Sequence, residues 1–184
     1  MTQRPTRRLR SRSSGGTRQR PILARLRVPL GFVFGALALA LASPTPRTLA
    51  WGGVVAILGE SLRVWASGHL EKSREVTSSG PYRWTRHPLY VGSSIMGVGL
   101  AIASARWEVA LVVVVYLVAT LTAAIRSEEA FLTTAFGDAY PQYRAGHLGV
   151  ARPFSWRRAQ ANREYRAGVG LLAVMLFLAW KAWG

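Results

Sequence analysis

One short segment of the chain concentrates groups that can bind a polar ligand at the edge of an apolar run. Residues 80–92 read Gly-Pro-Tyr-Arg-Trp-Thr-Arg-His-Pro-Leu-Tyr-Val-Gly, with two Arg, one His, one Trp and two Tyr in thirteen positions. A second polar cluster, Arg126-Ser127-Glu128-Glu129, ends a later apolar run. Polar and charged groups at the edge of a bilayer are costly and usually serve a ligand. Two such clusters at the same end of neighbouring membrane helices predict a binding site.

The composition restricts the class of protein. The chain has 184 residues, half of them apolar, with seven Trp and no Cys. One domain is the expectation from length, and a disulfide framework, a thiol nucleophile and a Cys-ligated metal are excluded. A net charge of +16 suggests nucleic acid as the partner of a soluble protein, but no motif of a nucleic-acid module follows the basic residues. We expect them to face anionic membrane lipids and not nucleic acid, and we predict no metal site.

The chain divides into a basic arm and a membrane domain. Residues 1–27 hold nine Arg and no acidic residue, so they cannot bury enough apolar surface to fold alone; we predict a disordered cytosolic arm, with a transit peptide as the alternative. Within the domain at 28–184, five apolar segments follow at 28–43, 48–66, 88–105, 107–125 and 168–183. Each is close to the shortest length that spans a bilayer. The predicted fold class is all-α, a polytopic membrane bundle of about five transmembrane helices, although the fifth segment could instead lie in the interface.

The distribution of charge predicts an orientation. With a cytosolic N-terminus, the cytosolic side holds residues 1–27, 67–87 and 126–167, with nine, four and seven Lys and Arg, twenty in all. The opposite side holds three, Arg47, Arg106 and Lys181. Positive residues concentrate on the cytosolic side of membrane proteins. We therefore expect both polar clusters, and the pocket that they form, at the cytosolic face.

Two charged residues lie inside the second apolar segment. Glu60 and Arg63 are three positions apart, so they share one face of a helix. One interpretation is an ion pair satisfied inside the bundle. The other is that Arg63 faces a ligand chamber and orients an anionic group. The sequence favours neither.

The order of these motifs resembles a known family. Gly80-Pro81-Tyr82, Arg86-His87-Pro88-Leu89-Tyr90-Val91-Gly92, Glu128-Glu129 and the polar aromatic segment 136–143 together look like the isoprenylcysteine carboxyl methyltransferase family. The related phospholipid N-methyltransferases have a similar C-terminal half. The resemblance covers about residues 60–153. It implies an integral membrane enzyme that uses S-adenosylmethionine, bound at the cytosolic face, and a lipophilic acceptor that enters from the bilayer.

The chemistry of S-adenosylmethionine matches the residue types present. Its ammonium needs a carboxylate, which Glu128 or Glu129 can supply, and its carboxylate needs a donor such as Arg86 or His87. Its adenine and sulfonium favour aromatic surface, available from Tyr82, Trp84 and Tyr90. The resemblance adds the stretch before Gly80. The predicted cofactor-binding residues are Arg74, Glu75, Val76, Thr77, Tyr82, Arg86, His87, Pro88, Leu89, Tyr90, Gly92, Glu128 and Glu129.

Each motif also has a purely structural interpretation. Gly80-Pro81-Tyr82 is typical of a turn, and Pro88 suits the first turn of a helix, where its missing N–H costs nothing. Gly92, together with the glycines at positions 97 and 99, predicts close helix packing, since small residues let membrane helices approach. Gly92 could also leave room for the cofactor.

The acceptor site departs from the family pattern. Ala124 stands one turn before Glu128, where the family has an Arg for the acceptor carboxylate, and Arg126 is the nearest candidate. The predicted catalytic residues are Arg126, Arg63 and Glu128. A carboxylate acceptor needs no base, and His87 is the one His within residues 80–92, so isoprenylcysteine-type carboxylate O-methylation is favoured over methylation of a phospholipid amine or a thiol.

Further expectations concern the surroundings of the site. We predict that residues 136–143 form a helical cap over the cofactor and that the lipophilic or lipidated acceptor enters between the second and fourth segments. The basic residues 152–166 are predicted to lie on the membrane surface, or else to form a connecting loop. Two other classes of function stay open, an NADPH-dependent lipid or sterol-type reductase of related fold and a non-catalytic lipid-binding protein. The oligomeric state is left open.

Overall fold

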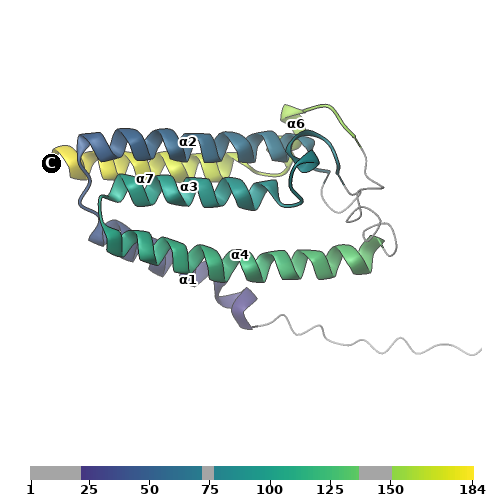
Figure 1. Ribbon diagram of the computed structural model, residues 1–184, viewed down its shortest axis with the longest axis horizontal. Helices are drawn as coiled ribbons and strands as arrows, with labels where there is room; N and C mark the ends of the chain where they lie inside the picture. Colours follow the sequence, from purple (N-terminus) through teal and green to yellow (C-terminus); the bar gives the residue numbers. More distant parts are fainter. Residues whose placement is uncertain (1–21, 72–76, 137–150) are drawn as a thin grey trace, which may run out of the picture.

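The chain folds into a helical bundle in which antiparallel membrane helices pack side by side (Figure 1). The computed structural model describes residues 22–71, 77–136 and 151–184, and the side chains of residues 31–71, 77–126 and 151–184. The helices are α1 (Ile22–Leu41), α2 (Pro46–His69), the short 3₁₀ helix η1 (Gly80–Arg83), α3 (Pro88–Ser104), α4 (Trp107–Phe136), α6 (Trp156–Ala161) and α7 (Tyr165–Trp183). The predicted all-α class is confirmed.

All five predicted apolar segments form helices. By length and composition, three are long and apolar enough to cross a membrane, Pro46–His69, Trp107–Arg126 and Tyr165–Trp183, while Gly31–Leu41 and Pro88–Ser104 are shorter. Two boundaries differ from the prediction. The first helix begins at Ile22, inside the predicted arm, and α4 continues to Phe136, past the predicted end at residue 125.

The centre of the bundle is the contact between α2 and α3, which lie side by side in Figure 1. A Cβ atom at Gly52 would lie 2.4 Å from the backbone of Gly99 and Ala103, and one at Gly59 would lie 2.5 Å from the backbone nitrogen of Met96. The two backbones therefore touch where glycines face each other. Lipid tails are as apolar as the helices, so close backbone packing replaces the hydrophobic effect as the force that joins them.

Local signals fix the ends of α2 and α3. Thr45 caps α2 because its side-chain hydroxyl accepts from the backbone amide of Thr48. The hydroxyl of Thr48 in turn accepts from the backbone amide of Thr45, which completes a capping box. Pro88 occupies the first turn of α3, as predicted. At its other end α3 stops at Ala105, which has a left-handed φ of 53°, and Trp107 starts α4 immediately. This tight connection makes α3 and α4 an antiparallel hairpin.

The C-terminal segment is tied to α2 rather than simply linking two helices. Asn162 donates from its side-chain amide to the carbonyls of Ser67 and Leu70, both at 2.9 Å. Arg158 donates to the carbonyl of His69 at 3.3 Å. These bonds satisfy carbonyls at the end of α2 that have no partner within the helix. They bring α6 to one end of the bundle, and from there α7 runs back along α2 (Figure 1).

Candidate functional site

Residues 80–92, called the signature segment below, are packed against the end of α2 by a buried histidine. His69 is 7% exposed, and its Nδ1 lies 2.8 Å from the carbonyl oxygen of Arg152 and 3.0 Å from the hydroxyl of Ser79. A carbonyl can only accept, so Nδ1 carries the proton. Gly80 lies over the ring with a φ of +59°, and a Cβ there would come within 2.4 Å of the ring carbon Cδ2. His69 and Gly80 thus set where the signature segment begins.

Two aromatic rings of the signature segment stack at the start of α3. His87 is the residue before the helix, and Pro88 begins it. The rings of His87 and Tyr90 lie 5.6 Å apart at an interplanar angle of 29°. The amides of Tyr90 and Val91 both donate to the carbonyl of His87, which holds this first turn. The predicted His87-to-Tyr90 element is therefore one compact unit.

The second polar cluster comes to the same end of the bundle. In the antiparallel hairpin, Gly97 of α3 packs against Leu117 of α4. Continuing that register puts the level of Pro88 at the level of Arg126. Arg126 is exposed, and residues 128 and 129 follow on the same helix, with side chains outside the described set. The backbone thus places the two clusters at the same end of the bundle.

Arg63 is the centre of a polar network between three helices. Its Nε donates to Glu164 at 2.7 Å and lies 3.5 Å from Oε2 of Glu60. Its Nη1 donates to the hydroxyl of Ser93 and lies 3.5 Å from the carbonyl oxygen of Leu89. The pair of Glu60 and Arg63 is therefore real, but the shortest ionic contact of Arg63 is to Glu164.

The predicted cofactor residues have different surroundings. Arg74, Glu75 and Val76 lie outside the described residues. Thr77 is 3% exposed, and its hydroxyl has no hydrogen-bond partner among the described residues, so it is available to a ligand. Tyr82, His87, Leu89 and Tyr90 are half-buried, Pro88 is buried and Arg86 is exposed.

Two other residues of the signature segment, Gly92 and Trp84, contact α2. Gly92 faces α2, where a Cβ would lie 2.7 Å from the carbonyl of Gly59. Its packing role is confirmed. Trp84 is 74% exposed and makes an edge contact with Trp65 at 5.4 Å.

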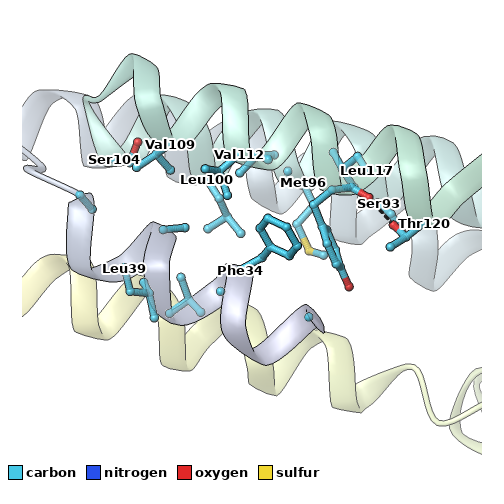
Figure 2. A pocket seen from close by; sticks show the side chains of 18 of the residues that line it. Phe34, Leu39, Ser93, Met96, Leu100, Ser104, Val109, Val112, Leu117 and Thr120 are labelled. Carbon is cyan, nitrogen blue, oxygen red and sulfur yellow. Dashed lines mark hydrogen bonds between the residues drawn. The ribbon is translucent and has the colours of Figure 1, made fainter. Parts of the chain in front are cut away.

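An apolar cavity of about 350 Å³ lies between α1, α3 and α4, and Val174 and Leu178 of α7 also line it (Figure 2). Figure 2 shows Phe34 from α1, Met96 from α3 and Val112 from α4 around it. Its polar lining groups include the hydroxyls of Ser93 and Thr120. Ser93 both lines the cavity and accepts from Arg63, so it connects the cavity with the Arg63 network.

The position of this cavity differs from the place where the sequence predicts acceptor entry. The sequence predicts acceptor entry between the second and fourth segments, but α3 lies between α2 and α4 (Figure 1). No residue of α2 is among the described residues that line the cavity. The glycines bring α3 directly onto α2, so α3 and not α2 lines this cavity opposite α1. The route by which an acceptor enters stays a prediction.

The fold and the clustered polar groups define a membrane helix bundle with a polar site at one end. Residues 33–139 match the family model described as phospholipid methyltransferase. That match covers more than half of the chain, so the chain belongs to the phospholipid methyltransferase family. The resemblance read from the signature motifs is confirmed.

One curated relative and the solved structures complete the comparison. Protein-S-isoprenylcysteine O-methyltransferase of Schizosaccharomyces pombe is 31% identical over 86 residues, which are 47% of this chain and 36% of that protein. The chain therefore spans well under half of that relative. No solved structure matches. The helices α6 and α7 lie beyond the residues matched by the family model.

Sequence reasoning missed two residues of the site, His69 and Glu164. His69 was a lone histidine at the end of an apolar segment. Glu164 is the only acidic residue after position 138, amid a strongly basic stretch. That isolation is a signal, because a single carboxylate next to a membrane helix is costly unless it has a cationic partner.

Proposed function

We propose that this chain transfers a methyl group from S-adenosylmethionine to a lipophilic acceptor held in the cavity between α1, α3 and α4. The observation that carries the proposal is the meeting of three features at one end of the bundle. These are the stacked His87–Tyr90 turn, the end of α4 and the Arg63 network beside an apolar cavity. Family membership supports methyl transfer as the reaction class.

The proposed cofactor contacts follow from the chemistry of the groups. Glu128 binds the ammonium, with Glu129 beside it, and Arg86 or His87 binds the carboxylate. Tyr82 and Tyr90 supply aromatic surface for the adenine and the sulfonium. The buried hydroxyl of Thr77, which has no hydrogen-bond partner among the described residues, fits a polar ligand. The stretch Arg74, Glu75 and Val76 completes the pocket, which we place at the cytosolic face because of the charge asymmetry of the chain.

The bound cofactor supplies a methyl group on a sulfonium, and the chain's own residues prepare the acceptor. Arg126 supplies the positive charge for an anionic head group, and Arg63, already paired with Glu60 and Glu164, reaches the cavity through the hydroxyl of Ser93. The cavity holds the apolar part and excludes water. A carboxylate acceptor is ionised at neutral pH and needs no base. We therefore favour carboxylate O-methylation of an isoprenylcysteine-type acceptor. The relative in Schizosaccharomyces pombe carries that acceptor in its name.

Two experiments test the proposal. Calorimetry on the purified chain in detergent should detect binding of S-adenosylmethionine. Incubation with radiolabelled cofactor and a membrane extract should put the label into the organic phase. Absence of any binding at millimolar cofactor would refute the cofactor assignment, and label confined to small aqueous products would refute a lipophilic acceptor.

A matched pair of variants tests the cofactor contact. Residues 128 and 129 both lie on α4, which continues to Phe136, and neighbouring helical residues point about 100° apart. We expect Glu128→Gln to cost about 2–4 kcal/mol of cofactor binding energy, the loss of a charged partner, and Glu129→Gln to cost less. The reverse order would assign the contact to Glu129.

A further inference from the structure

A second cavity lies on the other side of the Arg63 network, between α2 and α7. Its volume is about 850 Å³. Apolar residues of both helices line most of it, and Trp65, Phe154 and Trp156 line it as well. It shares no lining residue with the cavity between α1, α3 and α4. Its wall on the α7 side belongs to a region beyond the family match.

One acidic side chain faces this otherwise apolar space. Glu60 lines the cavity, and its side chain is 13% exposed. Its Oε2 is buried and makes no hydrogen bond with the described residues, although Arg63 Nε lies 3.5 Å away. Across the cavity wall Gly168 leaves room for the other oxygen, since a Cβ there would lie 3.3 Å from Glu60 Oε1. A buried carboxylate oxygen without a donor is costly.

The charges around Glu60 do not balance. Among the described side chains, those that act on Glu60 are Arg63 and Glu164. Two carboxylates thus share one guanidinium, and that guanidinium gives its shortest ionic contact, 2.7 Å, to Glu164. When both carboxylates are ionised, one negative charge is left over beside an apolar groove, where unpaired charge is expensive. A ligand with a positive charge would neutralise it.

The depth of Glu60 suits the head of an amphiphile. Helix α7 has 19 residues, about 28 Å at 1.5 Å per residue, close to the thickness of the hydrocarbon core. Tyr165 begins α7 and therefore lies near one boundary, where Trp65, Phe154 and Trp156 form an aromatic rim of the kind found at membrane interfaces. Gly168, which lies beside Glu60, is about one helical turn deeper in the membrane than Tyr165.

We propose that the α2–α7 groove binds a cationic amphiphile, an ammonium group carried on an apolar chain. The ammonium pairs with Glu60, and the chain lies along Ile57, Leu171 and Met175 toward the middle of the bilayer. The aromatic rim adds cation–π attraction for an ammonium on its way to Glu60. The site lies apart from the acceptor cavity, so its ligand is not the methyl acceptor, and the proposal does not depend on methyl transfer.

The test measures binding of a long-chain amine by quenching of tryptophan fluorescence. The full chain is reconstituted in nanodiscs of phosphatidylcholine and titrated with dodecylamine, whose ammonium, when paired with Glu60, lies next to Trp65 and Trp156 and quenches their fluorescence. Dodecanol has the same chain without the charge and is the ligand control. We expect saturable quenching by the amine, at least tenfold tighter than by the alcohol, and at least tenfold weaker binding of the amine by Glu60→Gln.

A second pair of variants keeps the test decisive if Glu60→Gln fails to fold. Gly168→Leu fills the groove beside Glu60, whereas Gly170→Leu points into open space, with nothing within 4 Å of its Cβ. We expect Gly168→Leu to abolish saturable quenching and Gly170→Leu to preserve it. Equal binding of amine and alcohol, or unchanged binding in Gly168→Leu, would overturn the proposal. If the groove binds no amine, and the wild type is a dimer that Gly168→Leu converts to a monomer, the groove is instead a contact between two copies of the chain.

Discussion

The two neighbours of α2 are held to it in opposite ways. Helix α3 lies backbone against backbone, with glycines on both helices and no room for side chains between them. Helix α7 is held through side chains, by the ionic contact of Arg63 with Glu164 and by the bonds of the preceding segment to the end of α2. Backbone contact fixes the start of α3, where the signature segment lies. Side-chain contact leaves a groove that can take a ligand.

The first prediction breaks the backbone contact. In Gly52→Leu the new Cβ would lie 2.4 Å from backbone atoms of α3, which cannot give way as a side chain can. We expect the chain to lose its folded state, an effect beyond the usual 1–3 kcal/mol or so of overpacking. Thermal unfolding in detergent, followed by circular dichroism, measures it.

The control for that experiment is Gly170→Leu on α7, where nothing lies within 4 Å. We expect it to unfold at the same temperature as the wild type or slightly higher, because glycine is a poor helix former. Two variants with equally small losses of stability would mean that α2 and α3 do not touch as closely as the structure has them.

The second prediction breaks the ionic contact on the other side of α2. In Glu164→Ala, Arg63 keeps Glu60 at 3.5 Å but loses its 2.7 Å partner. We expect a loss of about 1.5–3 kcal/mol, the contribution of a hydrogen bond to a charged group, because Arg63 keeps Glu60 as its counter-ion. Glu108→Ala, which breaks the more exposed pair with Arg106, is the control and should cost less than about 1 kcal/mol. Equal losses would deny the buried network a special role.

The third prediction separates the structural and chemical roles of Arg63. Replacing all three charges, in Arg63→Met with Glu60→Gln and Glu164→Leu, leaves no unpaired buried charge in the network and should recover most of the lost stability. If Arg63 holds the acceptor head group, this stable variant should still bind S-adenosylmethionine while its KM for an anionic acceptor rises about tenfold or more. Stability restored together with a wild-type KM would confine Arg63 to a structural role.

The sequence predicted what depends on local patterns. Apolar runs predicted the helices, and Pro88 predicted the start of α3. The glycines at 92, 97 and 99 predicted close helix packing, but not that the partner is α2 for Gly92 and Gly99 and α4 for Gly97. The sequence did not predict what depends on distant partners. Glu164 meets Arg63 across 101 positions, and His69 meets the carbonyl of Arg152 across 83, so neither contact leaves a periodic trace. The sequence also did not show that α3 lies between α2 and α4, because which helices are neighbours is a property of the whole bundle.

The last and smallest prediction concerns a contact between α7 and the end of α1. Lys181, near the end of α7, donates to the carbonyls of Leu39 at 3.1 Å and Ala40 at 2.9 Å. These carbonyls end α1 and have no partner within that helix, so a cation there stabilises it. We expect Lys181→Met to cost about 1 kcal/mol, and Lys181→Arg, which keeps a cationic donor, to cost less.

The effect of Lys181→Met should be local to α1. Leu39 lines the cavity between α1, α3 and α4, so loosening the end of α1 should speed hydrogen exchange in residues 38–41 and raise the KM of the acceptor. Exchange in α3 should stay as slow as in the wild type, because its contact with α2 does not involve Lys181. Faster exchange in both helices would mean that α7 supports the whole bundle, and the contrast between a backbone-packed side and a side-chain-tethered side would no longer hold.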